Sequence, residues 1–342
     1  MIDIKLLEQL CLCNGISGDE GNVRNLIINE IKDCADDIKT DNLGNLIVFK
    51  KGKKSAKSKL MVSAHMDEVG LMVTDITSDG YLKFDEVGGI DRRVLPGKRV
   101  CVGRNGLNGV IGVKPIHLTN GDEKTAVPKM SDMYIDIGAE SREDALKYVN
   151  YGDSINFEGD FKINGKTVVT KALDDRFGCY VLINLIKSEP EYDMYFTFVV
   201  QEEVGLRGAR PAAFTVNPDF ALVIESTTAA DVAEVDASHQ VCNLSKGATV
   251  TVMDRATVYD KEMISAAFEL AEKNNIAVQY KRAVAGGNDS GAIHQSRGGV
   301  RTLAVSLPSR YIHAPSTAAN LDDCESVLNL QKYCPIILRA EI

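Results

Sequence analysis

The chain has 342 residues, 44% of them apolar and 25% charged, and a formal net charge of −9 at pH 7. This charge argues against a nucleic-acid partner, which would need a basic face, and no apolar run approaches the roughly 18 residues that cross a bilayer. The length suits one large domain or two. The acidic start of the chain does not resemble a signal peptide. Its eight cysteines are scattered without paired Cys-x-x-Cys sets, so we expect reduced thiols, no zinc–thiolate site and a cytoplasmic protein.

The N-terminal part predicts two helices and then two strands. Apolar residues at helical spacing predict a helix over Ile4–Leu12. The segment Ser17-Gly-Asp-Glu20 has the pattern of a capping box, in which both side chains satisfy free amides at the start of the next helix. Strands are expected over residues 44–49 and 59–64, and the lysine-rich run 50–59 between them is expected to be a solvated hairpin tip.

The composition and residue pattern of the sequence change between about residues 70 and 169. Glycines are frequent, and apolar residues alternate with polar ones in short segments, which is typical of a small β-rich domain. A single helix is expected after Ser141, and residues 114–132 are expected to form a long loop. The expected strands of this region are residues 81–84, 99–102, 110–113, 134–137 and 154–157.

After this region the alternation of helices and strands returns. A glycine-rich turn over residues 286–291 should lead into a short helix, and Pro335 should kink or restart the last helix. We therefore predict an α/β fold with a mostly parallel sheet, formed by residues 1–68 and 168–342. A barrel-like, β-rich insert domain of residues 69–167 should interrupt it. The expected strands after the insert are residues 195–200, 220–225, 276–280 and 300–307, and the expected helices are residues 176–186, 260–274 and 321 onwards.

Four apolar strands are followed by side chains that can bind metal. These are His65, the pair Glu202 and Glu203, Glu225, and His313, in chain order. Asp174 stands at the start of the helix that follows the insert. Taken singly, each could be an ordinary solvated residue at a strand end. If the strands are parallel, however, their carboxyl ends share one edge of the sheet and these side chains converge.

Two imidazoles and several carboxylates, without thiolate, suit zinc, cobalt or manganese. One bridging carboxylate could hold two such ions about 3.5–4 Å apart. A further carboxylate beside them could take a proton from the attacking water and pass it to a leaving amine. The reaction class that these residue types indicate is metal-assisted hydrolysis.

Five ordered motifs resemble the TET-type aminopeptidases, which are dinuclear metallopeptidases of clan MH, some of whose members carry an endoglucanase label. The resemblance covers nearly the whole chain, including a β-rich insert between the first motif and the second. The motifs are Ala64-His-Met-Asp-Glu68, Lys171-Ala-Leu-Asp-Asp-Arg176, Val200-Gln-Glu-Glu-Val-Gly-Leu-Arg-Gly-Ala209, Gly286-Gly-Asn-Asp-Ser-Gly-Ala-Ile293 and Arg310-Tyr-Ile-His-Ala-Pro315.

The resemblance implies that His65 is a ligand of one metal, that Asp67 orients this histidine as part of the catalytic set, and that Asp174 bridges both metals. The remaining ligand in many members is an aspartate after the next strand, where this chain has Glu225. Because glutamate is one methylene longer, its carboxylate must fold back or bind in a different mode. Asp231, deeper in the following loop, is the less favoured substitute.

The resemblance further implies that Glu202 is the general base and that Glu203 and His313 bind the second metal. Asp289 either caps the amides at a helix start or belongs to the wall of the substrate pocket, and the resemblance favours the pocket wall. The remaining histidines are not expected to be ligands: His117, His239 and His294.

The leading hypothesis is a cytoplasmic aminopeptidase with two divalent metal ions per subunit that acts on short peptides. The insert would make dimer contacts, and dimers would assemble into a large hollow particle such as a dodecamer.

One alternative is a glycoside hydrolase, which needs two carboxylates about 5–9.5 Å apart on either side of a sugar bond. However, the chain has no tryptophan that could provide an aromatic sugar platform. The other alternative is a non-catalytic subunit of a mixed assembly. The preferred N-terminal residue is not predicted, because the sequence alone places no basic residue in the pocket.

Overall fold

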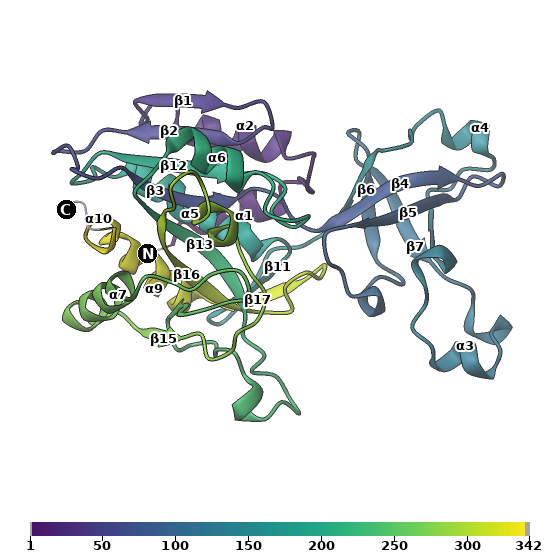
Figure 1. Ribbon diagram of the computed structural model, residues 1–342. Coiled ribbons are helices and arrows are strands. Elements are labelled where there is room, and N and C mark those ends of the chain that lie inside the picture. Colours follow the sequence, from purple (N-terminus) through teal and green to yellow (C-terminus); the bar gives the residue numbers. More distant parts are fainter. Residues whose placement is uncertain (1, 339–342) are drawn as a thin grey trace.

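The computed structural model describes residues 2–338, and an eleven-stranded mixed sheet forms its body (Figure 1). The main path of the sheet runs, in spatial order, β1 (Asp37–Thr40), β2 (Leu46–Lys50), β12 (Met194–Val199), β3 (Leu60–His65), β13 (Phe220–Thr228), β16 (Arg301–Arg310), β17 (Thr317–Asn320), β11 (Thr167–Thr170) and β10 (Lys162–Asn164). Off this path, β14 (Ala248–Val250) pairs with β16 and with β15 (Val278–Tyr280).

The four central strands β12, β3, β13 and β16 are parallel to one another. They are buried almost throughout, which explains why their sequences are nearly continuous apolar runs. Their carboxyl ends therefore share one edge of the sheet, as the sequence predicts. The flanking strands pair antiparallel, so the sheet as a whole is mixed.

Helices pack against this sheet. The long helix α5 contacts β3 and β13 as well as α1, while α6 and α8 contact each other and the strands β12, β13 and β16. The helices of the body are α1 (Ile4–Leu12), α2 (Gly21–Ile31), α5 (Leu173–Lys187), α6 (Ala209–Val216), α7 (Lys261–Lys273), α8 (Ser290–Ile293), α9 (Leu321–Gln331) and α10 (Cys334–Ile337), with a 3-10 turn η4 (Ala237–His239). The restart at Pro335 is confirmed, because α10 begins one residue before it.

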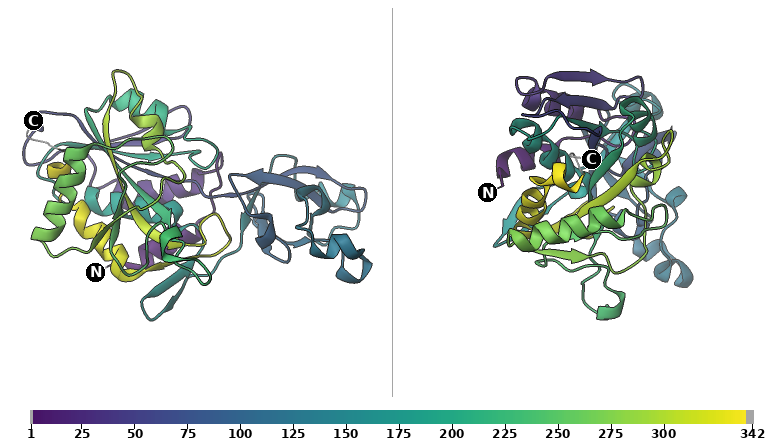
Figure 2. Two further views of the ribbon diagram at one scale, coloured as in Figure 1. Left: turned by 60° about the horizontal axis from the view of Figure 1, so that its bottom comes forward. Right: turned by 60° about the vertical axis from the view of Figure 1, so that its left-hand side comes forward.

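A closed, six-stranded antiparallel barrel with its own apolar core stands apart from the body (Figures 1 and 2). Its strands in order are β4 (Gly70–Ile76), β5 (Leu82–Val87), β8 (Tyr134–Asp136), β7 (Leu107–Gly112), β6 (Arg99–Val102) and β9 (Ser154–Phe157). Its short helices are η1 (Arg92–Val94), η2 (Ile116–Leu118), α3 (Gly121–Thr125), η3 (Met130–Asp132) and α4 (Arg142–Ala145). Three of them, η2, α3 and η3, lie in the segment 114–132 that is expected to be a loop, so the prediction of a single helix in this region is wrong. The fold class is nevertheless the expected one. The main sheet resumes at β10, a few residues before the boundary predicted at residue 168.

Two predictions for local structure in the body are also wrong. The lysine-rich segment 51–59 is largely exposed but is not a hairpin tip, because β12 inserts between β2 and β3. The capping box does not form: α2 has no side-chain cap, and Ser17 donates its hydroxyl to Asp67 instead. Glu20 accepts the N–H of Gly18 and that of Gln201. In both cases a long-range partner replaces the local one that the sequence pattern predicts.

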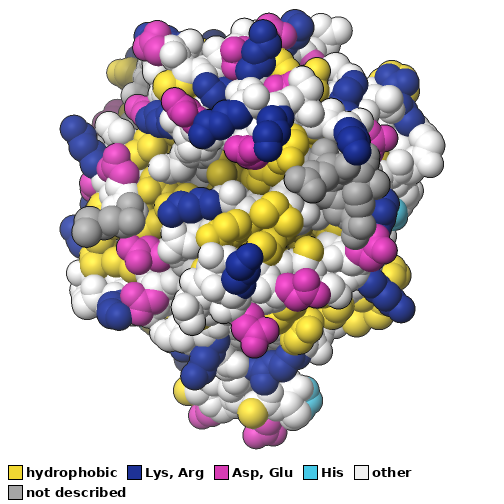
Figure 3. All heavy atoms as spheres, turned by 90° about the vertical axis from the view of Figure 1, so that its left-hand side faces the viewer, with side chains coloured by type: hydrophobic (Ala, Val, Ile, Leu, Met, Phe, Trp, Pro, Cys, Tyr) yellow, Lys and Arg dark blue, Asp and Glu magenta, His cyan; other side chains and the backbone are white. Residues whose placement is uncertain are grey.

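The face turned away from the barrel carries apolar side chains between scattered charged ones (Figure 3). A hollow of about 520 Å³ at this end of the body is lined by Met194, Leu328 and Pro335, among others. Among the described residues there is no helix long and apolar enough to cross a membrane.

Candidate active site

His65 is the last residue of β3 and is 1% exposed. Its Nδ1 lies 3.0 Å from the carbonyl oxygen of Asp67, so a proton on Nδ1 would leave Nε2 free to face the other elements. The backbone N–H of His65 donates to Oδ2 of Asp175 at 3.3 Å, which ties the end of β3 to the start of α5. The sequence offers no signal for this contact.

The structure brings the predicted metal-binding side chains together in two groups that share Asp174. In the first group, Nε2 of His65 lies 3.4 Å from Oδ1 of Asp174 and 3.2 Å from Oε1 of Glu225. In the second group, Nε2 of His313 lies 3.6 Å from Oδ2 of Asp174 and 3.2 Å from Oε2 of Glu203. Because each oxygen of Asp174 faces a different histidine, this carboxylate is placed to bridge two ions.

Glu225 occupies the position at which the family resemblance implies an aspartate. Its carboxylate folds back, since Oε1 accepts the N–H of Ser226 at 3.2 Å while facing His65. Asp231 lies in neither group. Both of its oxygens pair with Arg310, at 2.7 and 2.9 Å, so its carboxylate is already satisfied.

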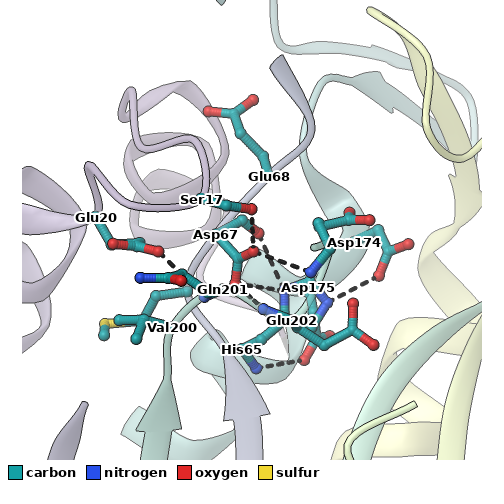
Figure 4. A network of polar contacts seen from close by, with 12 residues as sticks. Ser17, Glu20, His65, Asp67, Glu68, Asp174, Asp175, Val200, Gln201 and Glu202 are labelled. Carbon is teal, nitrogen blue, oxygen red and sulfur yellow. Dashed lines mark hydrogen bonds and ion pairs between the residues drawn. The ribbon is translucent and has the colours of Figure 1, made fainter. Parts of the chain in front are cut away.

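Asp67 organises the segment that carries the two adjacent glutamates (Figure 4). It is fully buried, and its Oδ1 and Oδ2 accept the N–H groups of Glu202 and Glu203 at 3.0 and 3.1 Å. Burial alone would raise the pKa of Asp67, but contact with His65 and hydrogen bonds from Ser17 and Glu202 lower it below its ordinary value. Asp67 therefore stays ionised and orients both His65 and the Glu202–Glu203 backbone.

The electrostatics of the site fit bound cations. Burial, followed by repulsion from Asp174, raises the pKa of Glu203 to about 8, and burial raises that of Glu225 to about 7. Contact with Asp174 raises the pKa of His313 to about 9. Oδ1 of Asp174 and Oε2 of Glu225 are buried without a hydrogen-bond partner among the described residues. Carboxylates this crowded are stabilised by positive charge, so the donor set fits a pair of divalent cations.

Glu202 lies beside the two groups but belongs to neither. Burial is the main cause that raises its pKa well above the ordinary value, and the neighbouring carboxylates of Glu225 and Asp289 add to it. Within the described side chains its carboxylate has no hydrogen-bond or ion-pair partner. It faces a cavity of about 540 Å³ that also exposes Asp174, Glu203, Glu225 and His313.

Lys281 lines the same cavity, and sequence analysis did not find it. It follows β15, and its Nζ donates to the carbonyl oxygen of Ala285 at 3.0 Å. Burial lowers its pKa, an effect that Asp254 and Glu225 oppose. Nothing in the local sequence marks this lysine, because only the packing of β15 beside β14 brings it to the cavity.

Both predictions for Asp289 are wrong. It makes no side-chain cap at the start of α8, and its neighbour Asn288, rather than Asp289 itself, lines the cavity. Asp289 is fully buried, and neither oxygen has a hydrogen-bond partner among residues 2–338. The other histidines lie in neither metal-binding group: His117 and His239 are exposed on 3-10 turns, and His294 Nδ1 contacts the Ser290 carbonyl.

The insert also reaches the site. A Cβ on Gly88 would lie 3.2 Å from Cβ of Glu203, and one on Gly89 would lie 3.8 Å from Nδ1 of His313. Gly88 has φ +88°, a conformation that favours glycine. The loop after β5 thus packs its backbone against two of the candidate metal-binding side chains, Glu203 and His313.

Comparison with known proteins relates the chain to a family of aminopeptidases. Residues 44–330 match the family model described as M42 glutamyl aminopeptidase. A putative aminopeptidase of Acetivibrio thermocellus is 43% identical over 327 residues, which are 95% of this chain and 96% of the relative. The lysyl aminopeptidase of Pyrococcus furiosus is 33% identical over 344 residues, 97% of this chain and 96% of the relative.

The solved structures extend the likeness to three dimensions. The dodecamer of the Pyrococcus horikoshii TET1 peptidase is 39% identical with a TM-score of 0.85, and the match covers 97% of this chain and 98% of that one. The family model and these relatives span the insert as well as the body. The chain therefore belongs to the M42 family of peptidases, as an aminopeptidase of the TET type.

Proposed function

We propose that the protein uses two divalent cations, zinc or cobalt with manganese as the third candidate, to remove the N-terminal residue of peptides. His65, Asp174 and Glu225 would hold one cation, and Asp174, Glu203 and His313 the other. The observation that carries this proposal is the sharing of Asp174 between two His–carboxylate groups at the wall of one cavity. When bound, such cations polarise the scissile carbonyl and generate a nucleophile from water near neutral pH.

Glu202 is the proposed general base. Its carboxylate faces the cavity and belongs to neither metal-binding group, so it can accept a proton from the attacking water. The same proton then passes from Glu202 to the nitrogen of the leaving amine as the peptide bond breaks. Asp67 keeps this base in place, because it holds the N–H groups of both Glu202 and Glu203.

We also propose that Lys281 favours substrates with an acidic N-terminal residue. The family description names a glutamyl aminopeptidase, whereas one relative is a lysyl aminopeptidase. Lys281 supports the first preference for this chain, because its ammonium lines the cavity that also exposes Glu202. A glutamyl side chain entering the cavity could form a charge-assisted hydrogen bond with Nζ.

The proposed setting is a homo-oligomer in the cytoplasm. The TET1 relative is a dodecamer, and we propose that dimers formed through the insert assemble here into a comparable particle. The eight cysteines are all free, which supports a reducing compartment.

The test combines metal analysis with a substrate panel. The full chain is loaded with Zn²⁺ or Co²⁺ and assayed with glutamyl, leucyl and lysyl anilides and with a soluble cellulose derivative. We expect anilide hydrolysis that a chelator abolishes and added metal restores. Hydrolysis of cellulose alone would support the glycosidase alternative, and metal binding without any hydrolysis would support the non-catalytic one.

A further inference from the structure

The turn before α2, residues 15–20, reaches into the candidate active site (Figure 4). We call it the N-terminal turn. Ser17 Oγ donates a hydrogen bond of 2.6 Å to Oδ2 of Asp67, and Glu20 Oε1 accepts the N–H of Gln201 at 3.1 Å. Ser17 is 5% exposed and Glu20 is 4% exposed, so both bonds are shielded from water.

Two carboxylates together hold the backbone that carries the proposed base. Asp67 accepts the N–H groups of Glu202 and Glu203, and Glu20 accepts that of the preceding residue, Gln201. Gln201 has φ +57°, in the left-handed region that is unfavourable for a residue with a side chain. Partners outside the segment are therefore needed to keep three consecutive amides in this arrangement.

We infer that Ser17 and Glu20 are positioning residues for the Glu202–Glu203 pair. This inference rests on the proposed function, since it assigns these residues a role in presenting a base and a metal ligand. A carboxylate can rotate broadly about its last torsion, and the Ser17 hydroxyl selects one orientation of Asp67. Residues that orient ligands in this way contribute about 10–100-fold to metal affinity or activity.

The same turn offers a matched control. Oδ2 of Asp19 accepts a hydrogen bond of 2.6 Å from Ser154 Oγ, on strand β9 of the barrel. Asp19 and Ser17 thus each make one side-chain hydrogen bond of equal length, to the insert and to Asp67 respectively. Removing the Asp19 bond loosens the turn without removing a partner of Asp67.

The test measures kcat, KM and Co²⁺ affinity of full-chain variants, with the thermal midpoint as a check on folding. Ser17→Ala should lower kcat and Co²⁺ affinity about 10–100-fold with little change in KM, and Ser17→Thr should restore both because it keeps a hydroxyl. Glu20→Gln keeps an acceptor oxygen and should resemble the wild type, whereas Glu20→Leu should resemble Ser17→Ala. Asp19→Ala should retain wild-type kcat and Co²⁺ affinity.

Wild-type kcat and Co²⁺ affinity in both Ser17→Ala and Glu20→Leu would overturn the inference. Equal losses in Asp19→Ala would also overturn it, because they would reflect loss of the turn rather than loss of positioning. If the wild-type chain hydrolyses no anilide, the proposed function fails. The Co²⁺ affinities of Ser17→Ala and Asp19→Ala then decide the positioning inference by themselves.

Discussion

Oε1 of Glu225 lies 3.2 Å from Nε2 of His65 across two neighbouring parallel strands. Strand β13 pairs with β3 up to Val223 opposite Ser63, and both Glu225 and His65 stand two residues further along their strands. Side chains two residues apart on a strand point to the same face, so the register brings this pair together. The extra methylene of Glu225 is taken up by the fold-back toward Ser226, and the carboxylate still faces the histidine.

Replacing Glu225 should therefore affect one metal and not the fold. In Glu225→Ala, metal content should fall from two ions to about one per chain, because the His65 group keeps too few ligands. The measurement is metal analysis after dialysis, with the thermal midpoint as a check. Asp231→Ala serves as the control, since Asp231 pairs with Arg310 rather than with the site. Full metal content in Glu225→Ala would remove Glu225 from the ligand set.

The barrel should carry the assembly contacts. Leu71 on β4 pairs with Ile155 on β9, so the chain enters and leaves the barrel on neighbouring strands. A short linker can therefore join Val69 to Glu158 and replace the barrel. Such a deletion retains β10 and β11 in the main sheet. Its particle mass by light scattering should drop well below that of the full chain. An unchanged mass would show that the body alone mediates assembly.

The ion-free protein should lose stability as pH rises. The folded-state pKa of His313 is about 9 instead of 6.5, so its stabilisation is present below pH 6.5 and is lost through about pH 9. The pKa of Glu203 is about 8 instead of 4.5, so its burial destabilises the protein increasingly from about pH 4.5 to about pH 8. Both groups bind protons more tightly in the folded state than in the unfolded state, so both make the free energy of unfolding fall as pH rises. The pKa of Asp174 is lowered, so the contribution of this group to stability changes with pH only below its ordinary value of 3.8.

Metal binding displaces these protons, so metal affinity should increase with pH and the pH slope of stability should flatten in the loaded protein. Urea unfolding of chelator-treated and metal-loaded samples at about pH 5.5, 7 and 8.5 measures both effects. A free energy of unfolding that rises with pH in the ion-free protein would contradict these assignments.

Lys281 should control the choice of N-terminal residue. Lys281→Met should lower kcat/KM for a glutamyl anilide by about 10-fold or more, the usual effect of losing a hydrogen bond to a charged group. Hydrolysis of the leucyl anilide should not fall. Lys273→Met, at an exposed position in the last turn of α7, controls for net charge. Equal losses on both substrates would argue against a specificity role for Lys281.

Strand ends were the most predictable part of this protein. Apolar runs that stop at His65, Glu202 and Glu225 reveal strands, and parallel pairing then brings their ends together. The predicted capping box in the N-terminal turn is wrong because the capping pattern depends only on local spacing, whereas Ser17 donates to Asp67, which is 50 residues away.

For the same reason, local sequence patterns do not predict the surroundings of Lys281 and Asp289. Whether a lysine lines a cavity or a carboxylate is enclosed depends on elements that meet only after folding. The predicted hairpin between β2 and β3 does not form, because β12, a strand more than 120 residues further along the chain, lies between them. No local pattern records such an insertion.

The most direct test of the proposed mechanism is Glu202→Gln, assayed for turnover and metal content on the same sample. Glutamine keeps the shape and one acceptor oxygen but cannot take a proton, so kcat should fall about 10²–10⁴-fold. Both metals should remain, because Glu202 belongs to neither metal-binding group. Glu203→Gln, in contrast, should lose metal as well as rate, because Glu203 faces His313 at 3.2 Å. A Glu202→Gln protein with near-normal turnover and full metal content would contradict the proposed role of Glu202 as the general base.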